Sequence, residues 1–508
     1  MQVYTIPSIS TPLYTFLAVD TSDSIPPKYI SQSLSFFLQD LKDKIHVHEK
    51  EWDNYKKYTN IYEYIHTNNP YKKRSVSKYK PLSRSYFKMV ELVHEFRLLP
   101  ITYDGKSSTD NSFASSSDSK QPIDNRWHTN TSRRNLDNLF SKVNNTRTSV
   151  GVRGLDRLDN IDKRDDNGAQ SADNTEPTYP VKTRITRSPI CSFHLAEGPG
   201  GFIEAVVNLR KNPNDTYIGM TIHDHKNDGT IPTWKKSDHF LISNPNVKTE
   251  NGADGTGDIL SIANFEYCYN TYRSSMDFIT ADGGFDFSTD FNNQELQIVE
   301  LLFAQIAFAL VMQKPGGNFV LKIFDCFYHC TIDLLALLSS FYKTVYITKP
   351  QTSRSGNSEK YVVCKYFSRE HKVEDFYPYL YNAFSKNPST KHKLCVAPSI
   401  TFEDKSSSGI PRTHTFVPHF SVLTETPYIY RYLTSSIPIY FQIKIEEYNS
   451  GFGFYQIENI HNTITMIERN TKPERIDSLI QKNISKCIEW CLRYNIPHNT
   501  FLLHNTFT

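Results

Sequence analysis

His194-Leu195-Ala196-Glu197-Gly198-Pro199-Gly200-Gly201-Phe202-Ile203-Glu204-Ala205 is the stretch that decides the predicted fold. It ends an apolar run at residues 191–196 and leads into a helical pattern at residues 202–209, which predicts a strand, a glycine-rich turn and a helix. Such a turn brings the backbone close to a ligand, and the helix N-terminus offers unpaired N–H groups. The spacing differs from the Gly-x-Gly-x-x-Gly of dinucleotide enzymes, so a nucleotide-like cofactor fits better than nicotinamide or flavin. A glycine-rich turn can also simply join a strand to a helix, so the surrounding sequence must distinguish a cofactor site from an ordinary connection.

Short apolar runs alternate with helical patterns over residues 189–368, which predicts an α/β fold with a doubly wound sheet. The strand candidates are residues 191–196, 216–222, 276–281, 318–324, 345–348 and 361–366, and the helical patterns are residues 202–209, 294–312 and 331–341. The 294–312 pattern is apolar nearly all round, which predicts burial against the sheet.

The regions outside this core differ in composition. Residues 32–66 mix charged and aromatic residues at helical spacing, which predicts a helical N-terminal region over residues 1–102. Residues 103–188 are rich in Ser, Asn, Asp, Thr and Arg without a sustained period, which predicts a low-complexity, disordered insert. Residues 369–508 read as a mixed C-terminal region of unassigned role, with a helix over residues 475–494.

Bulk composition limits the partners and the location. The 508 residues carry a net charge of only +3, so a nucleic acid must be held by a local basic patch. The cysteines form no Cys-x-x-Cys pair, and the longest apolar run, 301–312, is shorter than the roughly 20 residues of a membrane span. We therefore expect no membrane association and an intracellular location, cytoplasmic or nuclear. Richness in Asn, Ile, Lys and Tyr, typical of AT-rich genomes, adds a viral replication site as an alternative.

At residues 196–202 the chain resembles the adenosylmethionine loop of FtsJ-like methyltransferases, especially the cap-specific mRNA nucleoside-2′-O-methyltransferases. Four further stretches match that family in the expected order. They are Ser83-Arg84-Ser85-Tyr86-Phe87-Lys88-Met89-Val90-Glu91-Leu92, Ala281-Asp282-Gly283-Gly284, Gly316-Gly317-Asn318-Phe319-Val320-Leu321-Lys322 and Ser358-Glu359-Lys360-Tyr361-Val362-Val363. The resemblance implies a Rossmann-like methyltransferase fold. The insert departs from compact members of the family, because it places Lys88 far from Glu197 in sequence.

The resemblance implies a catalytic tetrad of Lys88, Asp282, Lys322 and Glu359. A ribose 2′-hydroxyl must lose its proton as it attacks a sulfonium methyl group, and Lys322 is the implied general base. A lysine accepts a proton only when it is neutral, a form that burial and a neighbouring cation such as Lys88 favour. Asp282 and Glu359 would orient the ammonium groups, and no metal is required. Solvated surface positions are the alternative for Lys88 and Glu359.

The resemblance also implies S-adenosylmethionine as the cofactor. The implied contacts are Glu197, Gly198, Pro199, Gly200, Gly201, Phe202, Thr221, Asp258 and Asp282. Thr221 follows the second core strand, beside the cofactor ribose, and Asp258 is the candidate partner of the adenine amino group. An ordinary Gly/Asp turn is the alternative for Asp258.

A basic segment precedes the first tetrad lysine. Its candidate RNA-binding residues are Lys72, Lys73, Arg74, Lys78, Lys80 and Arg84, with Tyr79, Tyr86 and Phe87 interleaved. Cations bind phosphates and aromatic rings stack on unpaired bases, so the segment predicts single-stranded RNA beside the active site. A solvated basic loop is the alternative.

Together these features predict 2′-O-methylation of RNA, at the first transcribed nucleotide of capped mRNA, with other capping or transcription components as further partners. A 2′-hydroxyl acceptor excludes DNA. Two alternatives stay open: methylation of an internal ribose in ribosomal or transfer RNA, and a catalytically inactive RNA-binding scaffold with the same fold.

Overall fold

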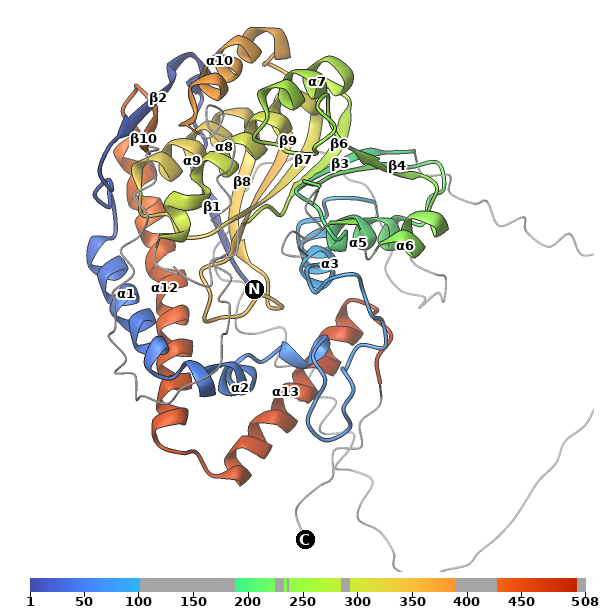
Figure 1. Cartoon of the computed structure of the whole chain (residues 1–508), viewed down its shortest axis with the longest axis vertical. Helices are drawn as coiled ribbons and strands as arrows, with labels where there is room; N and C mark the ends of the chain where they lie inside the picture. The colour runs from blue at the N-terminus through green and yellow to red at the C-terminus, as the bar shows by residue number, and fades with distance from the viewer. Residues whose placement is uncertain (101–187, 224–232, 235–236, 285–292, 389–426, 500–508) are drawn as a thin grey trace, which may run out of the picture. The chain divides into compact units, whose positions relative to one another are not determined.

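The computed structural model describes residues 1–100, 188–223, 233–234, 237–284, 293–388 and 427–499 (Figure 1). The predicted insert, residues 103–188, therefore lies outside the described residues except for Ser188. Residues on both sides of the predicted boundary at 368 belong to one compact unit, which comprises Met1–Thr102 and Thr186–Thr508.

The main sheet confirms the predicted doubly wound α/β fold. Within the described ranges it has eight strands, in the order β1-β8-β9-β7-β6-β3-β4-β5. Their bounds are β1 (Gln2–Ile6), β3 (Cys191–Leu195), β4 (Thr216–Met220), β5 (Val247–Glu250), β6 (Met276–Ala281), β7 (Gln313–Ile323), β8 (Tyr342–Lys349) and β9 (Lys360–Phe367). Strands β3 to β7 run parallel, and β9 is antiparallel to both β7 and β8. The chain order reverses between β3 and β6, and ligands of such sheets bind at the carboxyl ends beside this reversal.

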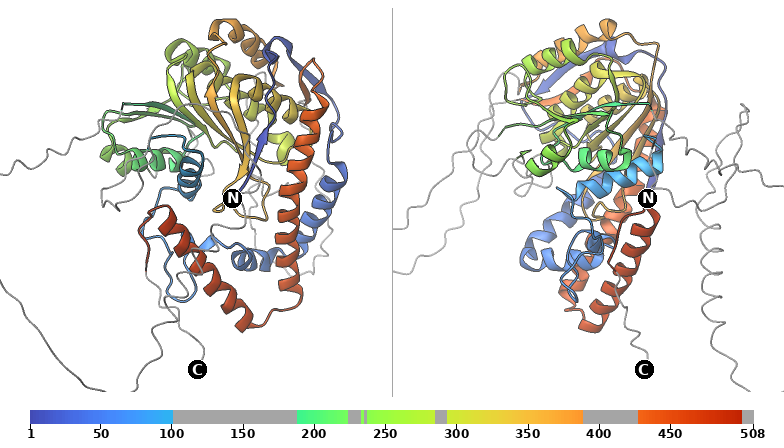
Figure 2. Two further views of the ribbon diagram at one scale, coloured as in Figure 1. Left: turned by 180° about the vertical axis from the view of Figure 1, so that it is seen from behind. Right: turned by 90° about the vertical axis from the view of Figure 1, so that its right-hand side faces the viewer.

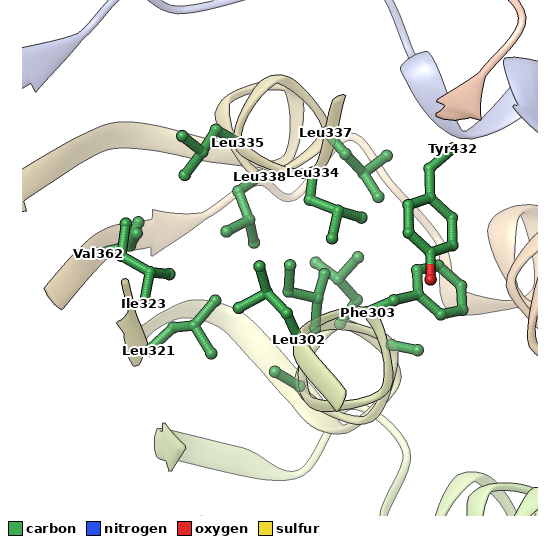
Figure 3. Packing of buried hydrophobic residues seen from close by; sticks show 14 of the residues in the cluster. Leu302, Phe303, Leu321, Ile323, Leu334, Leu335, Leu337, Leu338, Val362 and Tyr432 are labelled. Atoms are coloured by element: carbon green, nitrogen blue, oxygen red, sulfur yellow. The ribbon is translucent and has the colours of Figure 1, made fainter. Parts of the chain in front are cut away.

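Helices cover both faces of the sheet (Figure 1). One face carries α7 (Ile262–Tyr272), α8 (Gln294–Met312), α9 (His329–Phe341) and α10 (Val373–Lys386), and the other carries α3 (Ser85–Phe96) and α5 (Gly201–Arg210); a short α6 (Asp238–Ser243) precedes β5. Figure 3 shows Leu302 and Phe303 of α8 packed among leucines of α9 and apolar residues of β7 and β9. By length and composition α8 could cross a membrane, but 89% of its most apolar window is buried, so this core packing accounts for its apolarity.

Strand β7 distributes its side chains between two hydrophobic cores. Phe319, Leu321 and Ile323 belong to the core under α8, whereas Val320 belongs to the core under α3. Successive strand residues point to opposite faces, so Lys322 lies on the face that carries α3.

The outer regions contain strands as well as helices. They comprise β2 (Leu17–Ser22), α1 (Gln32–Val47) and α2 (Glu49–Thr59) before the core, and β10 (Tyr428–Leu433), α12 (Ile439–Glu468) and α13 (Pro473–Arg493) after it. Strand β10 pairs with β2, and α12 packs on both α1 and α2 (Figure 2). The prediction of a helical N-terminal region missed β1 and β2, because their partners β8 and β10 lie hundreds of residues away in sequence.

A buried carboxyl group holds the connection between β7 and α9. Both carboxyl oxygens of Glu295 accept from the N–H of Phe327 at 2.9 Å, and Oε1 also accepts from the N–H of Tyr328 at 2.9 Å. Burial raises the pKa of Glu295 to about 7, against which these hydrogen bonds act.

This raised pKa predicts a pH-dependent stability. The protonated carboxyl is favoured in the folded protein, so its contribution is complete below the unfolded pKa of about 4.3 and is lost as the pH rises through 7. The free energy of unfolding of the wild type, relative to E295Q, should therefore fall by about 2–3 kcal/mol between about pH 5 and pH 8. Urea unfolding at both pH values measures it, with the exposed Glu374→Gln as control. A difference that does not change with pH would contradict this account.

Candidate active site

The glycine-rich turn is closed by its own glutamate. Glu197 Oε1 accepts hydrogen bonds from the N–H groups of Phe202 at 2.7 Å and Ile203 at 2.8 Å, which satisfies two of the unpaired donors at the start of α5. Gly200 has φ +110°, a conformation that side chains rarely adopt. The turn therefore needs both this glutamate and this glycine.

The second oxygen of the same carboxyl group has no partner. Glu197 Oε2 is buried without a hydrogen bond among the described residues, and burial raises the pKa of Glu197 well above its usual range. A buried polar atom without a partner is costly, so a ligand that donates to this oxygen would remove the cost. The ammonium group of S-adenosylmethionine is a cationic N–H donor, which fits the partner that this oxygen lacks.

Helix α3 packs directly on this turn. A Cβ added to Gly201 would lie 2.1 Å from the hydroxyl oxygens of Ser83 and Ser85 and 3.2 Å from the backbone nitrogen of Tyr86. Glycine at position 201 thus permits the close approach of α3, which carries Lys88. The long insert does not prevent Lys88 from reaching the sheet.

Lys88 and Glu359 form a buried ion pair. The Lys88 Nζ lies 2.7 Å from Glu359 Oε1 and 2.8 Å from Oε2, and the two side chains are only 8% and 13% exposed. Burial lowers the pKa of Lys88, although Glu359 opposes that shift. Burial alone would raise the pKa of Glu359, but Lys88 and Lys322 bring it well below its usual range. Glu359 is therefore a carboxylate with two cationic neighbours.

Asp282 and Lys322 form the second pair. The Lys322 Nζ donates to the backbone oxygen of Asp282 at 2.6 Å and lies 3.3 Å from its Oδ1. Asp282 follows β6 directly, and the N–H of the next residue, Gly283, donates to Gln305 Oε1 at 2.9 Å. Gln305 of α8 thereby fixes the turn that presents Asp282.

Tyr361 joins the two pairs. Its hydroxyl accepts from Lys88 Nζ at 3.4 Å and donates to Asp282 Oδ1 at 3.3 Å. Burial, followed by the charges of Asp282 and Glu359, raises the pKa of Tyr361 well above its usual range, so it stays a donor. The sequence reasoning missed this residue, although it stands opposite Lys322 in the β7–β9 register. The predicted tetrad is thus brought together, with a tyrosine at its centre.

The remaining predicted cofactor contacts lie at the same end of the sheet. Thr221 follows β4 and is buried, and a Cβ added to Gly257 would lie 2.0 Å from its backbone oxygen. Asp258 comes next in that loop, where its Oδ1 accepts from the N–H of Leu260 at 2.9 Å and burial raises its pKa. The structure therefore places Thr221 and the loop of Asp258 side by side, and their roles toward a cofactor stay predictions.

The basic segment is only partly available to a ligand. Lys72, Lys73, Arg74, Lys78 and Lys80 are exposed. Arg84 instead donates to the backbone oxygen of Thr352 at 3.2 Å and lies 4.0 Å from Glu63. The prediction that aromatic residues of this segment stack on RNA bases is wrong for these side chains, because they already have partners inside the protein. Tyr86 and Phe87 are buried in the core under α3, and the Tyr79 hydroxyl donates to Glu204 at 2.6 Å.

A cavity of about 430 Å³ lies beside the tetrad, between α1, α2, α12 and the loop that precedes Glu359. Phe324 lines it, and the Lys322 Nζ lies 6.0 Å from the centre of that ring. Trp52, Glu49 and Asp53 of α2 line it as well, and Ser358 contributes from the residue before Glu359. It combines aromatic and acidic side chains with the basic side chains of Lys42, Lys56 and Arg354, at the scale of a small-ligand site.

Known proteins resemble the central part of this chain. Residues 159–367 match the family model of FtsJ-like methyltransferases. A cap-specific mRNA (nucleoside-2′-O-)-methyltransferase 2 from Drosophila melanogaster is 30% identical over 203 residues, which are 38% of this chain and 28% of that protein. A cap-specific mRNA (nucleoside-2′-O-)-methyltransferase 1 from Mus musculus is 36% identical over 195 residues, which are 36% of this chain and 22% of that protein. The methyltransferase 1 from Trypanosoma brucei brucei is 42% identical over 115 residues, which are 22% of this chain and 31% of that protein.

The chain thus spans less than a third of the length of these relatives. The matched residues include the glycine-rich turn, Asp282, Lys322 and Glu359, whereas Lys88 precedes them. Residues 159–367, with the order of their motifs, are thus similar to the FtsJ-like methyltransferase family.

Proposed function

We propose that this chain transfers a methyl group from S-adenosylmethionine to the ribose 2′-hydroxyl of RNA, at the first transcribed nucleotide of capped mRNA. One observation carries the proposal: Lys88, Asp282, Lys322 and Glu359 come from four segments and meet beside the glycine-rich turn. The names of the relatives support capped mRNA as the substrate.

The hydrogen bonding of the two lysines supports Lys322 as the base. Lys88 directs its ammonium group at Glu359 Oε1, Glu359 Oε2 and the Tyr361 hydroxyl, so its donors all have protein partners. Among the described residues, the Lys322 Nζ bonds only to two oxygens of Asp282, which leaves one position on it for a substrate hydroxyl. In the proposed reaction, Lys322 accepts the proton of the 2′-hydroxyl at its Nζ.

The cofactor supplies a methyl group activated by a sulfonium sulfur. The protein residues proposed to hold it are Glu197 with the turn at 198–202, Thr221, Asp258 and Asp282. Their contribution is alignment, since near-attack positioning can lower a barrier by about 7–11 kcal/mol. The buried Tyr361 and the Lys88–Glu359 pair fix Asp282 and so fix the direction of Lys322.

The cavity beside Phe324 is the proposed site of the methylguanosine cap. A methylated guanine is cationic and flat, so the rings of Trp52 and Phe324 can stack on it and Glu49 or Asp53 can attract its charge. Asp53 already contacts Lys56, which makes Glu49 the freer carboxylate. The cavity adjoins Lys322, so a cap here would leave the first nucleotide near the base.

A methyl-transfer assay tests the reaction and its base. Purified protein, labelled S-adenosylmethionine and matched RNAs with and without a methylguanosine cap would be compared. We expect label on the capped RNA alone, and at least about a hundredfold loss of kcat in K322A, because a general base contributes on this scale. K314A is the matched control on the same strand, where Lys314 is 53% exposed and pairs with Asp277. Label on uncapped RNA would move the substrate to internal riboses, and RNA binding without any label would favour the inactive scaffold.

Tyr361→Phe tests the link between the two ion pairs. Loss of the hydroxyl removes one hydrogen bond to Asp282 and one from Lys88, so kcat should fall about tenfold, the equivalent of about 1.4 kcal/mol. The KM for S-adenosylmethionine should stay unchanged, and the pH profile of kcat should shift. An unchanged kcat with lowered thermal stability would make this hydroxyl structural only.

Trp52→Leu tests the proposed cap site. Loss of one stacking ring should raise the KM for capped RNA about tenfold or more, because base stacking contributes about 1–3 kcal/mol. Turnover at saturating RNA should change little. Phe37→Leu is the control, since Phe37 lies on α1, is 52% exposed and does not line the cavity. Equal effects of the two substitutions would remove Trp52 from cap recognition.

A further inference from the structure

The C-terminal helices form a second hollow, which adjoins the cavity at Phe324 through Asn459, a residue that lines both. It has a volume of about 720 Å³ and is lined by the end of α2, by α12 and by α13. Figure 1 shows α12 and α13 diverging from their connecting turn, with α2 beside both. We call this hollow the α12–α13 groove. None of its residues belongs to the part of the chain that matches the methyltransferase family.

The groove is strongly basic. Arg469, Lys472, Arg475 and Lys482 line it, against the single acid Glu458. No side chain in the described part of the molecule forms an ion pair or hydrogen bond with any of these four cations. Elsewhere on α13 the cations are paired: Lys486 lies 2.7 Å from Glu489, and Arg493 lies 2.6 Å from Glu95 of α3. Clustered cations without counter-charges attract a polyanion.

An aromatic ring and amide groups also line the groove. Tyr58 contributes its ring, and Asn459, Asn462 and Asn483 contribute amides. Asn459 and Asn483 donate to the backbone oxygens of Thr59 and Tyr58, at 3.0 Å and 2.9 Å, so their positions are fixed. Amides and an aromatic ring in one groove with four cations suit a strand whose bases are unpaired.

The groove is joined to the basic segment that precedes Lys88. The Tyr71 hydroxyl donates to Asp477 Oδ1 at 3.0 Å, and Asp477 lies on α13 two residues after Arg475. The residues after α13 bond to the same segment, where the N–H of Lys78 donates to Pro497 O at 2.8 Å. Hydrogen bonds therefore connect the segment that carries the exposed cations of residues 72–80 to α13, which lines the groove, and the same segment continues into α3.

We propose that the α12–α13 groove binds single-stranded RNA, namely the chain that extends beyond the nucleotide held at the tetrad. The choice of RNA as the ligand of the groove rests on the proposed function, in which RNA is the substrate. Phosphates contact Arg469, Lys472, Arg475 and Lys482, and the bases face Tyr58 and the amides. The groove thereby adds affinity for long RNA that a short capped oligonucleotide does not gain.

The test removes the four charges from the full chain. The groove variant R469Q/K472Q/R475Q/K482Q is compared with a control variant, K343Q/R369Q/K372Q/K386Q, which removes four exposed cations near α10. Circular dichroism and thermal unfolding check that both variants fold. Binding of fluorescent single-stranded RNAs of about 4 and about 20 nucleotides is measured by anisotropy over a range of salt concentrations.

We expect the groove variant to bind the long RNA at least about tenfold more weakly, with a log–log salt slope reduced by about 3 for four lost phosphate contacts. Binding of the short RNA, and its methylation if it occurs, should match the wild type, as should both properties of the control variant. Equal long-RNA affinity in the two variants would overturn the proposal. Binding is measured without methyl transfer, so a groove effect in a protein that methylates nothing would refute the proposed function and leave the groove standing.

Discussion

The buried contact between Lys88 and Glu359 is the constraint on which the site depends. It joins a helix that precedes the insert to the segment that leads into β9, and both side chains are nearly inaccessible. Removing one partner from such a pair leaves an uncompensated charge and typically costs about 3–5 kcal/mol. Tyr361 is aligned by its hydrogen bond with Lys88, Asp282 by its hydrogen bond with Tyr361, and Lys322 by Asp282. One ion pair thus orders the side chains of four chain segments.

Helix α3 is in turn held by parts of the chain outside the family match. The Trp490 Nε1 of α13 donates to Glu91 Oε2 at 3.4 Å, and the Trp490 ring lies 5.8 Å from that of Phe87. Glu91 Oε1 also accepts from the N–H of Gln351 at 2.6 Å, in the loop before Glu359. Burial raises the pKa of Glu91 to about 7. A C-terminal helix of unassigned role therefore supports the helix of Lys88 and the loop of Glu359 together.

Local patterns in the sequence were sufficient to predict six of the eight strands described in the main sheet, all but β1 and β5, and to locate the motifs that carry the tetrad residues. Apolar runs mark β3, β6 and α8, and each tetrad residue stands in a motif of its own. Tyr361 could not be recognised, because its importance comes from the β7–β9 register. Helix α12 was missed because Gly451 and Gly453 weaken its helical pattern. A Cβ added to Gly451 would lie 2.0 Å from Tyr4, and one added to Gly453 would lie 2.8 Å from Leu34. Glycine is therefore required at both positions by contacts between distant segments, which the sequence does not show.

The small strand β1 has a consequence for association between molecules. It covers β8 along five residue pairs, from Gln2 opposite Lys349 to Ile6 opposite Val345. Its own outer side meets α12, where the Tyr448 hydroxyl donates to the backbone oxygen of Thr5. An uncovered edge strand is a template for strands of other molecules and so for aggregation. A chain without these few residues would expose the edge of β8. Protection of this edge against aggregation therefore depends on β1, a strand that lies beside β8 in space but more than 300 residues before it in sequence.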